Sequence, residues 1–164
     1  MARQGRYEEG LAQELQAVQI QRAIGFNVGR PQQLCQLVDA YIAAGRFDDA
    51  VGTLAEALPA VEAQGERYYE PEIHRLRGEL LLKMGPSDVV QAESCFENAI
   101  KVARQQDGKS LELRATTSLA RLLAWQDRRG EALAMLSEIY NWFTEGFDTA
   151  DLKDAKALLE ELAT

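Results

Sequence analysis

The stretch Gly45-Arg46-Phe47-Asp48-Asp49-Ala50-Val51 decides the fold, because the chain carries the same pattern forty residues earlier. At residues 5–11 the order is again a glycine, an arginine, an aromatic residue, two acids, a small residue and an aliphatic residue. Weaker copies occur at residues 88–92 and 127–133. The small position recurs at intervals of 40, 42 and 40 residues: Gly10, Ala50, Ala92 and Ala132. A fixed period in this range predicts helical hairpins that stack side by side, because one hairpin cannot bury its apolar face alone.

Apolar residues follow the small position at helical spacing. Four and seven residues further on, three of the four copies carry apolar or small residues: Leu54 and Ala57, Phe96 and Ala99, Leu136 and Ile139. The first copy differs, since Glu14 stands at the position four residues on. A small residue in the second helix of a hairpin lets the first helix approach closely, because no side chain holds the backbones apart. The glycine before it is then expected to mark the turn between the two helices.

The composition and the spacing of glycine and proline predict helix along the whole chain. Strong helix formers dominate, glycine and proline fall at regular intervals, and no stretch alternates as a strand would. We expect eight helices, at about 6–24, 31–44, 47–64, 68–84, 88–106, 110–126, 129–144 and 149–162. Pro59 lies inside the third helix and has no amide hydrogen, so a kink or an early break is expected there. Asp148 or Thr149 is expected to cap the last helix with a side-chain oxygen.

The overall composition excludes several classes of protein. The 164 residues are 46% hydrophobic and 27% charged, which is typical of a globular chain. No apolar run is long enough to cross a membrane, and no apolar signal region follows the N-terminus, so we expect a cytoplasmic protein. The 26 acids against 18 bases disfavour nucleic acid as a partner, which leaves a DNA-binding helical protein as a distant third hypothesis.

The segment Leu37-Val38-Asp39-Ala40-Tyr41, together with residues 45–57, resembles the tetratricopeptide repeat, although a period near 40 exceeds that family's usual length of about 34. Residues 65–81, 110–122 and 142–152 are similar to the C-terminal repeats of large bacterial signalling proteins. Those proteins carry an adenylate/guanylate-cyclase or winged-helix domain and a predicted ATPase. The resemblance implies an all-α superhelix of stacked antiparallel hairpins with a regulatory or scaffold role. It carries over no cyclase or ATPase activity, because no residue here corresponds to those domains.

We expect a single repeat domain over residues 1–164. Its parts are a half hairpin at 1–29, hairpins at 30–66, 67–108 and 109–145, and a cap at 146–164. The half hairpin lacks a first helix, which predicts either a piece of a longer protein or a homo-oligomer through this end. The last helix should close the other end with its apolar side: Leu152, Ala155, Leu158, Leu159 and Leu162. The aromatic residues before it, Trp142, Phe143 and Phe147, are interpreted as packing and not as a ligand pocket.

Motifs for catalysis are missing from the sequence. There is no glycine-rich phosphate loop, and the single histidine, His74, has only Glu70 and Glu79 near it, which makes a weak metal site. We interpret His74 as a surface or interface residue. Cys35 and Cys95 are interpreted as small buried hydrophobic residues. Acid pairs such as Asp48-Asp49 stand where a helix begins, and the helix dipole accounts for them. The sequence therefore predicts a protein without enzymatic activity, cofactor or metal.

In tetratricopeptide arrays the first helix of each hairpin lines the concave face. The resemblance therefore implies these partner-binding candidates: Gln32, Gln36, Asp39, Arg75, Glu79, Lys83, Arg114, Arg121 and Trp125. Residues 101–129 carry seven basic residues against three acidic ones, and we interpret them either as solvated helix faces or as a basic stripe for an acidic partner. Arginine and tryptophan are common at binding hot spots. One hypothesis is that Arg114, Arg121 and Trp125 grip an acidic or aromatic-bearing peptide. The other is that these positions are merely solvated and that Trp125 fills a helix junction.

Two function classes follow from the sequence. The favoured one is a non-enzymatic protein–protein interaction or scaffold module, a regulatory part of a bacterial signalling system that binds a peptide or partner domain. The alternative is a helical domain that senses a small ligand, or an enzyme, using the concave cavity.

Overall fold

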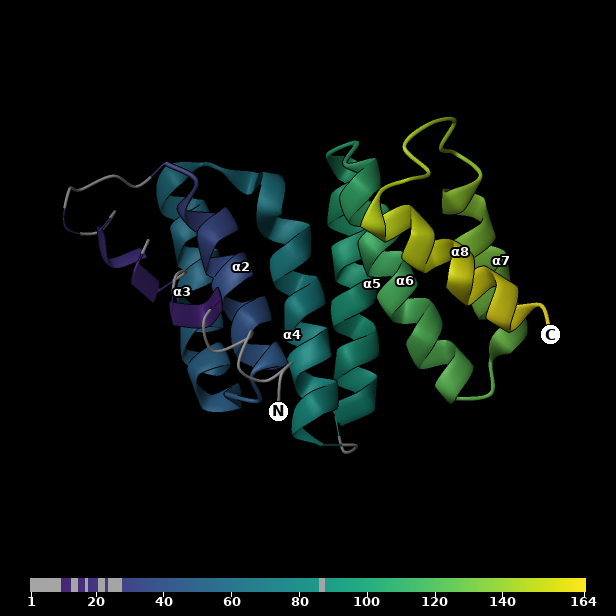
Figure 1. The fold of residues 1–164 in the computed structure, drawn as a ribbon, viewed down its shortest axis with the longest axis horizontal. Helices are drawn as coiled ribbons and strands as arrows, with labels where there is room; N and C mark the ends of the chain where they lie inside the picture. The colour runs from purple at the N-terminus through teal and green to yellow at the C-terminus, as the bar shows by residue number, and fades with distance from the viewer. Residues whose placement is uncertain (1–9, 13–14, 17, 21–22, 24–27, 86–87) are drawn as a thin grey trace.

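The computed structural model describes residues 10–12, 15–16, 18–20, 23, 28–85 and 88–164, and all regular structure in these residues is helical. The helices, drawn in Figure 1, are α2 (Arg30–Ala43), α3 (Phe47–Gln64), α4 (Glu70–Met84), α5 (Val89–Gln105), α6 (Lys109–Trp125), α7 (Arg129–Tyr140) and α8 (Ala150–Leu162). A short 3₁₀ helix, η1 (Arg67–Tyr69), precedes α4. The expected all-helical class is confirmed in these residues.

The predicted boundaries agree with the observed ones to within two residues at nearly every helix end. The exception is α7, which ends at Tyr140 and not at residue 144. Within the helix expected at 6–24, each residue that the structure describes is helical; the others, and the acid pair at 8–9, lie outside the described residues. The half hairpin at 1–29 lies largely outside them too.

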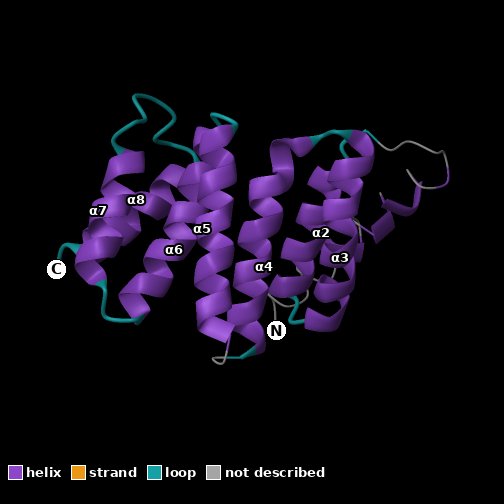
Figure 2. Ribbon diagram, turned by 180° about the vertical axis from the view of Figure 1, so that it is seen from behind, coloured by secondary structure: helices purple, strands orange, loops and turns teal. Residues whose placement is uncertain are grey.

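The α-helices form two layers. Helices α2, α4, α6 and α8 contact one another in that order, and we call them the even-helix layer. Among the α-helices that the structure describes, α3, α5 and α7 each contact only the even helices next to them in the chain, and α3 also contacts η1. Figures 1 and 2 show the two sides of this arrangement, with α2 and α3 at one end and α7 and α8 at the other. The first helices of the predicted hairpins therefore lie side by side on one face.

The repeated small positions occupy the contacts between the layers. Ala50, Ala92 and Ala132 are completely buried, each near the start of an odd-numbered helix. The apolar positions that follow are also buried: Ala57, Phe96, Ala99, Leu136 and Ile139, with Leu54 half-buried. Gly10, the small position of the first copy, is exposed. The sequence pattern thus predicted three of the four packing positions correctly.

Two of the hairpin turns share one backbone geometry. In the α2–α3 turn Gly45 has a φ of 72°, and the backbone N–H of the next residue, Arg46, donates to the carbonyl of Tyr41 at 2.9 Å. The α6–α7 turn has Asp127 at φ 65°, and Arg128 donates to the carbonyl of Leu123 at 2.8 Å. Asp127 therefore occupies, in the left-handed region, the place that Gly45 has in the other turn.

Two local expectations are wrong, namely an early break of α3 at Pro59 and a side-chain cap on α8. Helix α3 does not break at Pro59 but continues to Gln64. Pro59 and Ala55, whose carbonyl loses its helical donor, are both exposed, so solvent can serve that carbonyl. Thr149 does occupy the cap position of α8, but its side chain makes no capping hydrogen bond. Its backbone carbonyl instead accepts from the N–H of Lys153 at 3.1 Å.

The last helix closes the core as expected. Four of its predicted apolar positions are buried, namely Leu152, Ala155, Leu158 and Leu162, and Leu159 is half-buried against the same cluster. The aromatic residues before it differ from the prediction. Phe143 packs on the core, whereas Trp142 and Phe147 are exposed. The ring of Trp142 contacts that of Phe143, and the ring of Phe147 contacts that of Tyr140.

Candidate functional site

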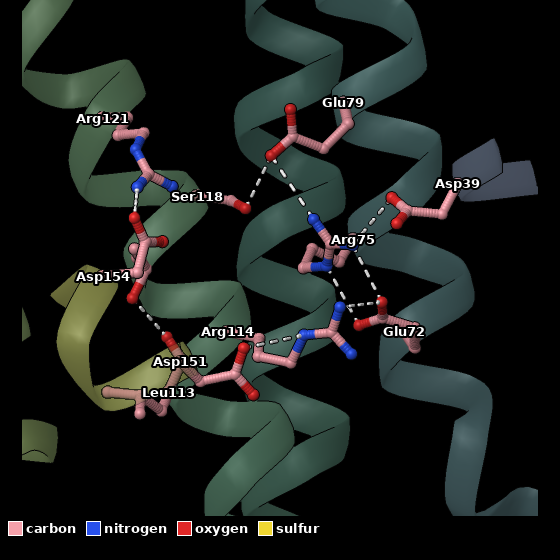
Figure 3. Close-up of polar contacts among 11 residues, drawn as sticks. Asp39, Glu72, Arg75, Glu79, Leu113, Arg114, Ser118, Arg121, Asp151 and Asp154 are labelled. Carbon is pink, nitrogen blue, oxygen red and sulfur yellow. Dashed lines mark hydrogen bonds and ion pairs between the residues drawn. The ribbon is translucent and has the colours of Figure 1, made fainter. Parts of the chain in front are cut away.

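All nine predicted partner-binding residues lie on the even-helix layer. Gln32, Gln36 and Asp39 belong to α2; Arg75, Glu79 and Lys83 to α4; and Arg114, Arg121 and Trp125 to α6. Within the described part of the chain, Gln32, Gln36 and Lys83 take part in no hydrogen bond or ion pair with one another or with the rest of the set. Asp39, Arg75, Glu79 and Arg114, in contrast, are connected through Glu72 by a chain of contacts that crosses from α2 to Asp151 of α8 (Figure 3).

Arg75 is the centre of this chain, and it is buried. Its guanidinium donates two hydrogen bonds to the carboxylate of Glu72, at 2.9 and 2.8 Å, and lies 3.5 Å from Glu79 and 3.8 Å from Asp39. Burial alone would lower the pKa of Arg75, but the hydrogen bonds and charge of Glu72, helped by Glu79 and Asp39, raise it above the ordinary value. Arg75 therefore stabilises the layer internally and offers little surface to a partner.

Glu72 is a site residue that the sequence reasoning missed. It is buried, and besides Arg75 it pairs with Arg114 of α6, whose Nη2 lies 3.1 Å from Glu72 Oε1. A signal for it existed, because Glu72, Arg75 and Glu79 are spaced three and four residues apart, as ion pairs on one helix face are. The link to Arg114 has no such local signal.

Helix α8 supplies carboxylates to the two arginines of α6. Arg121 donates from Nη2 to Asp154 at 2.5 Å, and Arg114 Nε lies 3.8 Å from Asp151. Figure 3 shows both pairs beside the Glu72–Arg75 pair, so that one row of alternating charges runs across the layer.

The basic stripe predicted at residues 101–129 is therefore not a row of free charges. Arg104 and Lys109 both donate to the buried carboxylate of Glu112, at 2.6 and 2.7 Å. Arg128 pairs with Glu93 and Glu131, and Arg129 donates to the carbonyl of Glu161. Together with Arg114 and Arg121, six of the seven basic residues bind an acid or a carbonyl of this chain.

Three of the predicted residues meet at a hollow between α4 and α6. Glu79, Arg121 and Trp125 line it together with Leu82, Val89, Ser118 and Leu122, and its volume is about 280 Å³. Trp125 is 68% exposed, so it does not fill a helix junction. An exposed indole beside the buried Leu122 and the half-buried Leu82 is the composition of an interaction site. We call this the Trp125 hollow.

Larger hollows lie away from the predicted residues. One of about 480 Å³ lies between α5 and α7 on the odd-helix side, and one of about 500 Å³ lies between α3 and α4. The first is lined by mixed charges such as Glu93, Lys101 and Arg104, and the second is mostly apolar. Neither gathers the residues that the repeat pattern places on the first helices.

Burial shifts the pKa of two reactive side chains, Cys35 and His74. Burial, with a contribution from Glu72, raises the pKa of Cys35 to about 12, so its thiol stays protonated at neutral pH. Burial also lowers the pKa of His74, which is half-buried and lines the hollow between α3 and α4. The described residues contain no group of three side chains able to hold a metal ion.

Comparison with family models finds no match, and comparison with curated proteins finds none either. In the part of the chain that the structure describes, no helix has both the length and the apolar character needed to span a membrane.

Proposed function

We propose that this chain is a non-enzymatic interaction module, a tetratricopeptide-like superhelix of stacked hairpins, which binds a peptide segment of another protein on its even-helix layer. The observation that carries the proposal is the Trp125 hollow. There, a largely exposed tryptophan and two charged residues chosen from the repeat pattern surround an apolar depression on the face formed by the first helices.

The packing of the repeats supports the hairpin-stack part of the proposal. Ala50, Ala92 and Ala132 are buried at equivalent places in successive odd helices, and the even helices contact one another in chain order. Stacked units of this kind present one continuous face of first helices, which suits an extended partner segment. A regulatory place in a bacterial signalling system is supported by the sequence resemblance alone.

The test is a selection of binding peptides from a random library displayed against the whole chain. Selected peptides are then measured against Trp125→Ala and against a matched control, Trp142→Ala, since Trp142 is also exposed (58%) but lies on the α7–α8 loop. We expect Trp125→Ala to weaken binding by about tenfold or more, as for aromatic hot spots, and the control to change it little.

Two results would contradict the proposal. One is a selection that yields no binding peptide. The other combines two measurements: a metabolite raises the melting temperature by several degrees in a thermal-shift screen, and Trp125→Ala leaves the affinity of every selected peptide unchanged. A rise in melting temperature would indicate a small ligand, because a ligand that binds only the folded state stabilises it.

A further inference from the structure

The charge pairing on the even-helix layer restricts the chemistry of a partner, and this inference rests on the proposed function. Arg75, Arg114 and Arg121 each already face a carboxylate of this chain. An acidic segment would have to compete with Asp151 and Asp154, which α8 holds in place. Because the apolar side of α8 is buried in the core, the backbone that carries these carboxylates is held beside the arginines.

The same argument applies to a basic partner. The carboxylates of Glu72, Asp151 and Asp154 are paired with arginines. Over the full lengths of α2, α4, α6 and α8, nine acidic side chains stand against nine lysines and arginines. Such a surface is nearly balanced, so it attracts neither sign strongly.

Because the arginines of the face are paired within the chain, the Trp125 hollow remains as the part of the face where a partner side chain can bind. Leu82, Val89 and Leu122 form its apolar lining, and the indole of Trp125 stands at its edge. A volume of about 280 Å³ suits a single large side chain and lies just below the range of about 300–1,000 Å³ usual for drug-sized ligands. The hollow therefore fits the anchor of a peptide better than a cofactor.

The charged residues of the hollow keep hydrogen-bonding capacity. Ser118 donates to Oε1 of Glu79 at 2.7 Å, and the contact from Arg75 reaches the same oxygen. The second oxygen of Glu79 points away from both (Figure 3). Arg121 uses Nη2 for Asp154, and its Nε and Nη1 make no hydrogen bond with another described residue. An acceptor and a donor thus remain beside an apolar depression.

We infer that the module holds its partner by an uncharged, large aliphatic or aromatic side chain in the Trp125 hollow. The backbone of the partner segment donates an N–H to Glu79 and accepts from Arg121 through a carbonyl. An acceptor and a donor beside an apolar pocket match the alternation of amide groups and side chain in an extended peptide. Charged side chains of the partner contribute little to its affinity.

The test uses small amide probes and the two tryptophans of the chain as reporters. The probes are the α-amides of four N-acetylated amino acids: leucine, phenylalanine, aspartic acid with its side-chain carboxylate free, and lysine. Each probe is titrated into the protein while the two indole N–H signals are followed by NMR. Trp125→Phe and Trp142→Phe assign the signals. We expect the leucine and phenylalanine amides to shift the Trp125 signal in a saturable way and to leave Trp142 unchanged, while the two charged amides shift neither.

Several outcomes would overturn the inference. They are an aspartate or lysine amide that shifts Trp125 as strongly as the leucine amide, no shift with any probe, and free leucine binding more tightly than its amide, which would indicate an amino-acid site. Peptides that bind the same face through acidic residues, with affinity falling steeply with salt, would overturn this inference but leave the proposed function intact. Failure to select any peptide would instead count against the proposed function.

Discussion

Phe96 of α5 lies directly against the backbone of α4 at Gly78. A Cβ atom built on Gly78 would stand 2.5 Å from Cε1 of the Phe96 ring, closer than such atoms approach in proteins. Phe96 is completely buried, so its ring cannot turn into solvent. The absence of a side chain at Gly78 therefore sets how closely α4 and α5 approach, and with them the position of Glu79 beside the Trp125 hollow.

We predict that Gly78→Ala destabilises the protein, although alanine is the better helix former. The added methyl group must displace a packed ring, and overpacking of this kind costs about 1–3 kcal/mol. Urea unfolding followed by circular dichroism measures the change.

The matched control is Gly52→Ala in α3, because a Cβ atom there meets nothing within 4 Å. Removing a glycine from a helix interior without a clash should stabilise the protein by roughly 0.5–1 kcal/mol. Equal effects of the two substitutions would show that the Phe96 contact does not limit the approach of α4 and α5.

The buried Glu72–Arg75 pair gives a second prediction. Arg75→Met alone should destabilise by about 3 kcal/mol, because it leaves Glu72 buried with one of its two arginines missing. The double variant Glu72→Leu, Arg75→Met should lose less than the sum of the single variants, since neither charge is then left alone. Strict additivity in denaturant unfolding would show that the two side chains are energetically independent.

The loss of folding stability at acidic pH gives a third prediction. Burial alone would raise the pKa of Glu112, but hydrogen bonds from Lys109 and Arg104 outweigh it and hold that pKa below the ordinary 4.5. A folded-state pKa below the unfolded one contributes stability above the unfolded value and loses it as the pH falls through the folded one.

Glu112→Gln should therefore lower the melting temperature at neutral pH and reduce the further drop measured below pH 4.5. Glu97→Gln serves as the control, because Glu97 is exposed on α5 and pairs with no other described residue. An unchanged slope for Glu112→Gln would mean that Glu112 does not couple folding to protons.

The equivalent turns give a fourth prediction. Gly45→Ala should cost roughly 1–2 kcal/mol, because a side chain is forced into the left-handed region at φ 72°. Asp127→Gly should be neutral or stabilise by less than about 1 kcal/mol, since Asp127 already occupies that region at φ 65°. Thermal unfolding checks both, and a large loss for Asp127→Gly would indicate that its side chain holds the turn.

Much of the helical arrangement was predictable from local patterns. The turn at Gly45 and the small residue Ala50 follow from a repeat within one hairpin, and periodicity of this kind needs no knowledge of distant contacts. The errors lie at helix interruptions and helix ends. Pro59 does not interrupt α3, because its side of the helix faces solvent, whereas α7 ends at Tyr140, four residues before the predicted end.

The sequence predicted where the residues of the candidate site lie, but not which side chains pair with them. Glu79, Arg121 and Trp125 do lie together, because equivalent positions of stacked helices share a face. The partners of the arginines come from other helices, such as Asp154, 33 residues from Arg121. Nothing local in the sequence relates these two residues.

The amino-acid sequence by itself determined that the described chain is helical and which small residues lie between its helices, because helix propensity, turn residues and repeat spacing act over a few residues. Only the tertiary structure decided which charges remain available, because an arginine and a carboxylate neutralise each other according to their distance in space. That is why Arg121, read from the sequence as a grip for an acidic partner, is paired with Asp154 and leaves the apolar hollow beside Trp125 as the stronger candidate for binding.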